Sequence, residues 1–179
     1  KVTLNYTKRS TSFSTVVIPQ QIELSGNKNH MNVSGDILIE NTSVFLPIET
    51  LLAFKESITP KSSYNFLGCN LDITLGNNNV FSTPLNQFIF KKGGKIKLSG
   101  PISLDNLKIK GEFLIERGDI TYISRNFNIR EGVIRFTGDD IIPFVNLVTW
   151  YRYRDINKEN VDIYLTLEGK ATKIILKDF

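Results

Sequence analysis

Apolar and polar residues alternate with a period of two along nearly the whole of this 179-residue chain. Val2, Leu4 and Tyr6 alternate with polar residues, and Leu71 and Ile73 flank an aspartate in the same way. A period of two indicates β-strands with one apolar and one polar face. The spacings between strands are too short for crossover helices. The sequence therefore predicts an all-β protein whose strands follow one another in an antiparallel meander.

Clusters rich in glycine, asparagine and aspartate punctuate the predicted strands and are typical of turns. They lie at residues 26–29, 76–79, 93–94, 100–101, 117–118, 131–132, 138–140 and 155–160. Only residues 47–66 break the pattern, and there we expect a short helix followed by a mobile loop because Pro60 interrupts any helix.

Composition favours one folded unit. Hydrophobic residues make up 41% of the chain and charged residues 22%, which is enough apolar surface for a core. The length suits a single β region spanning residues 1–179. Because Lys1 is not a methionine and no secretion leader follows it, we expect a fragment or processed form of a larger protein.

A sheet with one apolar face and no helical layer has to cover that face itself. A sandwich, a closed barrel and a long sheet curled lengthwise into a U-shaped half-pipe all achieve this, and periodicity alone does not choose between them. A lipid-facing outer-membrane barrel is disfavoured, because several apolar runs are shorter than the ~9–11 residues that its strands need.

Catalytic, metal and cofactor chemistry find little support. His30 is the only histidine and Cys69 the only cysteine, so no disulfide or thiolate cluster forms within the chain. The pair Asp139 and Asp140 lacks the ligand spacing of a calcium loop. We therefore expect neither a metal nor a cofactor.

Charged residues also favour structural roles. Asp119, Glu131 and Asp139 are each adjacent to a glycine, as solvated loop acids commonly are. We therefore do not expect them to form the carboxylate pair of a glycoside hydrolase, and we expect no enzyme. The net charge of +4 is spread thinly. Its densest cluster, Lys91 to Lys97, flanks a glycine pair and is predicted to be the solvated face of a hairpin. The cluster has no interleaved aromatic residues on which bases could stack, so we do not expect it to bind nucleic acid.

The order of motifs in the second half of the chain is more specific. Residues 111–122 read Gly-Glu-Phe-Leu-Ile-Glu-Arg-Gly-Asp-Ile-Thr-Tyr, residues 126–138 contain Ile-Arg-Glu-Gly-Val-Ile-Arg-Phe-Thr-Gly, and residues 143–149 read Pro-Phe-Val-Asn-Leu-Val-Thr. This order resembles the C-terminal domain of TamB, of the AsmA-like superfamily. Residues 71–76 resemble the strand that opens the family's region. The family's Pro-x-Leu-Asp-Ile-x-Ala strand appears here with Val145, Asn146, Leu147 and Thr149, and the loop from Tyr153 to Asn160 carries extra charge.

The resemblance implies a β-taco, an elongated antiparallel sheet curled into a half-pipe with an apolar interior. It implies a segment that carries phospholipid between the two membranes of a diderm bacterium, in the periplasm, within a parent anchored to the inner membrane. Membrane contact is then made by parts of the parent outside these residues. A BamA-like outer-membrane barrel is the implied protein partner. The alternative function is a chaperone-like assembly module that pairs its strand edges with that barrel.

The phase of the alternation also predicts which residues line the apolar interior. The expected lipid-contacting set is Ile96, Leu98, Phe113, Ile115, Ile120, Tyr122, Ile129, Ile134, Phe136, Val145, Leu147, Ile163 and Leu165. A carbohydrate-binding sandwich is a third possibility, and it requires Trp150, Tyr151 and Tyr153 to be exposed on one flat face.

Overall fold

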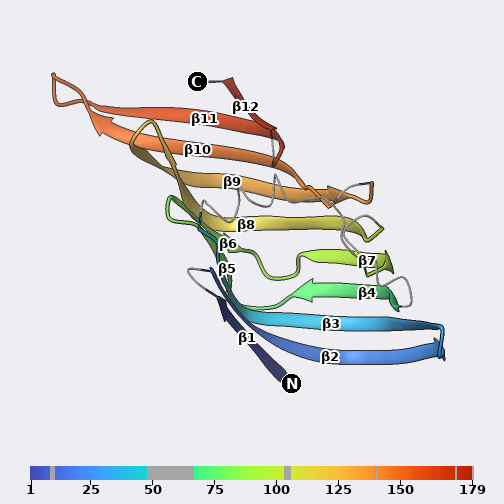
Figure 1. Cartoon of the computed structure of the whole chain (residues 1–179). Coiled ribbons are helices and arrows are strands. Elements are labelled where there is room, and N and C mark those ends of the chain that lie inside the picture. The colour runs from blue at the N-terminus through green and yellow to red at the C-terminus, as the bar shows by residue number, and fades with distance from the viewer. Residues whose placement is uncertain (9–10, 48–66, 103–105, 140, 172, 179) are drawn as a thin grey trace.

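In the computed structural model the chain forms one curved sheet, and the structure describes residues 1–8, 11–47, 67–102, 106–139, 141–171 and 173–178 (Figure 1). The strands are β1 (Val2–Lys8), β2 (Thr11–Asn27), β3 (His30–Phe45), β4 (Leu67–Leu75), β5 (Asn79–Ser82), β6 (Asn86–Phe90), β7 (Lys95–Pro101), β8 (Lys108–Tyr122), β9 (Arg125–Thr137), β10 (Phe144–Arg154), β11 (Asn160–Lys170) and β12 (Lys173–Asp178). The described part contains no helix. The predicted helix and loop at 47–66 fall almost wholly outside the described residues.

The strands lie in the order β1-β2-β3-β4-β7-β8-β9-β10-β11-β12, so chain order and spatial order nearly coincide. In Figure 1 the two termini therefore lie at opposite ends of the sheet. Strands β5 and β6 do not add positions to this order. Strand β5 continues in line with β4 beside β3, and β6 lies in line with β7 beside β8, so each pair forms one strand row. The prediction of one all-β sheet, curled and not closed into a barrel, is confirmed.

The sheet is mixed, which corrects the predicted meander. Strand β3 pairs in parallel with β4, over Met31↔Leu67 to Ile39↔Leu75, and in parallel with β5. A parallel pair needs a crossover connection, since a hairpin reverses the chain. The segment between β3 and β4 lies almost wholly outside the described residues, and in the sequence it is the place where the alternating pattern is interrupted.

Four of the predicted turns do not reverse the direction of the chain. Residues 117–118 and 131–132 lie inside the unbroken strands β8 and β9. Residues 76–78 and 91–94 separate strands that continue in the same direction, so the predicted hairpin around Gly93 is wrong as well. These positions are places where the strands bend.

The bends line up from strand to strand across the sheet. The ladder shifts or breaks between Ser14 and Val16, at 76–78, at 91–94, between Ile89 and Phe90, between Val148 and Thr149, and between Thr166 and Leu167. Hydrogen bonds and pairings connect each irregularity to the next, as where the Asn41 amide donates to the Asn77 carbonyl at 2.9 Å. We call this line the seam. Because a β-bulge bends a strand and increases its twist, a row of them curls the sheet along one line.

Buried polar side chains lie along the seam, where irregular backbone leaves ladder groups without regular partners. The Thr149 hydroxyl, fully buried, donates to the Leu165 carbonyl at 3.2 Å. The Asn79 amide donates to the Gly76 carbonyl at 3.1 Å. These contacts hold the bent strands together at the points where the regular ladder is interrupted.

Candidate functional site

The inner surface of the curled sheet is the candidate site, and its apolar side chains come from every strand row between β4 and β11. Cross-strand partners share a face of a sheet, so the register defines this surface. Ile73 pairs with Ile96, Ile96 with Gly111, Phe113 with Ile134, and Ile134 with Val145. We call the surface that contains these residues the concave face.

The bulges allow each strand to keep its apolar side chains on this face across the seam. In β8, odd-numbered residues such as Ile115 face inward before the bulge, and even-numbered residues such as Ile120 face inward after it. In β9 the bulge near Arg130 has the same effect on Ile129 and Ile134. Without the bulge, the alternation would keep one phase along the whole strand. The apolar residues on one side of the bulge would then face outward.

The register places all thirteen predicted residues on the concave face, but with two levels of exposure. Six are buried, namely Ile115, Ile120, Ile129, Val145, Leu147 and Leu165. Seven keep partial access to solvent, namely Ile96, Leu98, Phe113, Tyr122, Ile134, Phe136 and Ile163. The buried six form the floor of the bend, and the other seven are the ones that a bound molecule can reach.

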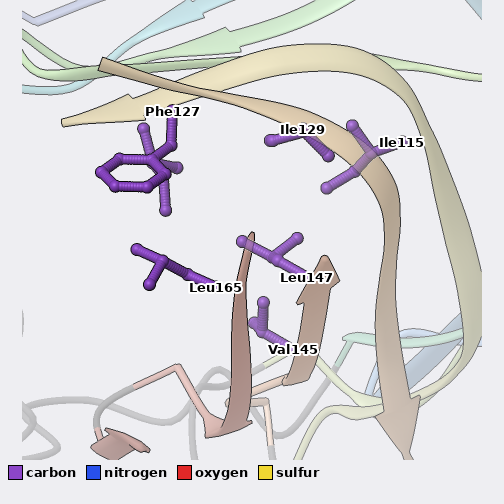
Figure 2. Close-up of a cluster of buried hydrophobic side chains, with 7 residues drawn as sticks. Ile115, Phe127, Ile129, Val145, Leu147 and Leu165 are labelled. Carbon is purple, nitrogen blue, oxygen red and sulfur yellow. The ribbon is translucent and has the colours of Figure 1, made fainter. Parts of the chain in front are cut away.

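The floor is a compact cluster. Figure 2 shows Ile115 and Ile129 inside the curved ribbons of their strands, with Phe127, Leu147, Val145 and Leu165 on the same side. Leu165 is 1% exposed and Leu147 3%. Full burial of a large apolar side chain stabilises a protein by ~1.5–3 kcal/mol. Because the described residues form one sheet without a second layer, this cluster is a main source of their stability.

Sequence reasoning missed several members of this face. Phe127 is 5% exposed and its ring lies 5.5 Å from that of Tyr151, measured between centroids. Phe90 lies against Phe113 with the two rings tilted and their centroids 5.7 Å apart. The alternation with a period of two places Phe127 and Tyr151 on this face. It does not place Phe90 there, because β6 is short and follows a turn.

Chemistry of the catalytic kind has no visible basis in the described residues. They contain no group of three His, Cys, Asp or Glu side chains that could hold a metal ion. Burial raises the pKa of the Cys69 thiol, which disfavours the reactive thiolate. No helix of the described part is long and apolar enough to cross a membrane.

The aromatic residues near the β10–β11 hairpin do not share one flat surface. Trp150 pairs with Tyr164 on the convex face, where the guanidinium of Arg152 lies 5.5 Å from the Trp150 ring. Tyr151 pairs with Ile163 on the concave face. Two surface depressions among the described residues lie elsewhere, one beside Lys91 to Lys95 and one on the convex face around Arg135.

The amino-acid sequence that forms this curled sheet was compared with the models of known protein families. The model of the TamB C-terminal domain matches residues 2–177. The chain belongs to the TamB C-terminal domain family. TamB proteins are bacterial envelope proteins, and membership supports a TamB-type role in assembly of the outer membrane. No curated protein matches the chain.

Proposed function

We propose that this TamB domain is a non-enzymatic lipid-transfer segment that holds phospholipid acyl chains against its concave face. One observation carries the proposal: the apolar face is continuous over the rows from β4 to β11, and seven of its large side chains stay accessible. An acyl chain gains ~0.8 kcal/mol for each CH₂ that it buries. Partial coverage of a long chain therefore offsets much of its removal from a membrane.

The open side of the curl suits movement along the face. A chain that slides from one strand row to the next meets mainly apolar side chains, which keeps the desolvation cost of each step small. In this proposal the parent protein, anchored in the inner membrane, places the domain in the periplasm, and a BamA-like barrel receives its outer end.

The test is recovery of lipid from the purified domain. Organic extraction of the folded protein followed by mass spectrometry should yield phospholipid in near-stoichiometric amount. The variant Ile134→Asp should reduce the yield, because it places a carboxylate among the acyl chains. Its neighbour Arg135→Asp, on the convex face, is the matched control. A folded protein that carries no lipid would argue against the proposal.

A second function, strand pairing with an outer-membrane barrel, is favoured by the exposed edge of the sheet. Strand β1 pairs only with β2 in the described structure, and Val2, Leu4 and Tyr6 on it are about half exposed. An edge of this kind can accept a further strand. Disulfide trapping between cysteines placed in β1 and in a barrel edge strand would support this function.

A further inference from the structure

The concave face carries one charged side chain in the strand rows from β4 to β11, as far as the structure describes them. It is Arg125, the first residue of β9. Arg125 pairs with Tyr122, two residues beyond the pair of buried residues Ile120 and Phe127, so it faces inward. Every other lysine, arginine, aspartate and glutamate of these strands lies on the convex face or at a bulge.

The Arg125 side chain is positioned by an aromatic wall. Its guanidinium lies 5.9 Å from the centroid of the Tyr151 ring, and one of its nitrogens donates a long hydrogen bond of 3.5 Å to the Tyr151 hydroxyl. The Tyr151 ring contacts Phe127, which in turn contacts Tyr122. These contacts use one face of the guanidinium and a single N–H, so four of its five donors are left for another partner.

No carboxylate neutralises Arg125 within the described residues. Two convex arginines do have such partners, since Arg135 binds Glu112 at 3.1 Å and Arg152 binds Asp162 at 2.6 Å. The last acid of β8, Asp119, pairs with Asn128 on the opposite face of the sheet. An unpaired guanidinium on an apolar surface is suited to an anion that arrives with an apolar body.

The location of Arg125 suits a head group. It lies beside the β8–β9 hairpin tip, where Ile123 is 77% exposed and adopts a left-handed backbone conformation with φ 46°. That conformation is costly for a β-branched residue, and asparagine or glycine is the usual choice in such a turn. The tip therefore presents an apolar side chain next to the cation at the rim of the concave face.

We propose that Arg125 binds the phosphate group of an amphiphile whose acyl chains lie on the concave face. This inference rests on the proposed lipid function and adds head-group recognition to it. The guanidinium binds two phosphate oxygens in a bidentate manner, while Tyr151 fixes its orientation. An inorganic phosphate makes the charged contact alone, and so it lacks the binding that chain burial supplies.

The test uses the full purified chain and vesicles that contain phosphatidylglycerol and diacylglycerol with identical acyl chains in known proportions. The ratio of the two lipids bound to the protein, relative to that in the vesicles, is measured by extraction and mass spectrometry. Wild type should enrich phosphatidylglycerol about tenfold more than Arg125→Gln does. Arg125→Lys should keep part of the enrichment. Arg117→Gln, the same charge change on the convex side, should behave as wild type.

The outcomes separate the two proposals. If wild type and Arg125→Gln bind both lipids in the same ratio, the head-group inference is overturned and the lipid function stands. If the folded wild type binds neither lipid, both fail. Displacement of phosphatidylglycerol by inorganic phosphate at millimolar concentration would show a simple anion site and would also overturn the inference. Far-UV circular dichroism checks that each variant is folded.

Discussion

Single residues on the floor of the bend carry much of the stability of this sheet. Leu165 is 1% exposed and lies among the side chains of β9 and β10. Leu165→Ala should lower the free energy of unfolding by about 2–5 kcal/mol, because it removes buried methyl groups and leaves a cavity. Urea denaturation measures the change. Ile156→Ala, at a position that is 100% exposed, is the control and should change stability by less than about 0.5 kcal/mol.

The Arg152–Asp162 pair on the convex face gives a prediction for acid pH. Arg152 donates two hydrogen bonds, of 2.6 and 2.7 Å, to the two carboxylate oxygens, and these bonds hold the pKa of Asp162 below its ordinary value. A lowered folded-state pKa gives stability that is present above the ordinary pKa and lost as the pH falls through the folded-state pKa.

The variant Arg152→Gln should therefore return the pKa of Asp162 towards its ordinary range, which NMR titration of the carboxyl carbon measures. The stability difference between wild type and this variant should shrink in acid and vanish below the folded-state pKa. If the difference is the same at acid and neutral pH, the ion pair is not its cause.

At the scale of elements, the seam explains how strands of 13 and 15 residues curl into one half-pipe. Gly132 lies at the inner corner of β9, where a Cβ would come within 2.8 Å of the Ile115 Cδ1 and 3.0 Å of a Leu147 methyl group. Gly132→Ala should therefore cost about 1–3 kcal/mol through overpacking, measured by chemical denaturation.

A double variant tests the stated cause. Ile115→Val removes the Cδ1 atom that the new methyl group would meet, so Gly132→Ala should cost clearly less in that background than in wild type. Additive effects of the two substitutions would mean that the crowding lies elsewhere.

The seam also marks the limit of what the sequence predicted about the elements. Strand phase followed from the alternation, and so did the inward direction of the thirteen residues. In the sequence, Gly118 and Gly132 are turn signals, whereas both glycines lie within bent strands in the structure. A glycine relieves crowding in either setting, so local sequence does not distinguish a bend from a reversal. The distinction depends on partner strands far away in the chain.

The inward position of Arg125 was missed for a related reason. Its face is set by the register of the β8–β9 hairpin, and that register depends on a two-residue turn at Ile123 and Ser124, both with positive φ. Neither residue is typical of such a turn. Local sequence therefore does not predict a turn at these two residues or the start of a strand at Arg125.

At the scale of the whole molecule, the proposed lipid function depends on a difference between the two faces of the sheet. The parallel pairing of β3 with β4 and β5 keeps the sheet continuous where the antiparallel order changes. The apolar surface therefore extends across these paired strands. Outside, the strands carry charges that pair across the sheet, such as Lys97 with Asp72. Acyl chains should therefore contact one face and avoid the other.

The most direct test of this claim is site-specific photo-crosslinking in cells, with the crosslinking amino acid placed at adjacent residues of β9 in the parent protein. Ile134 faces inward and is partly accessible, and Arg135 faces outward. The account predicts phospholipid adducts, detected by mass spectrometry, from position 134 and few from position 135. Equal adducts from both positions, or adducts from position 135 alone, would contradict it.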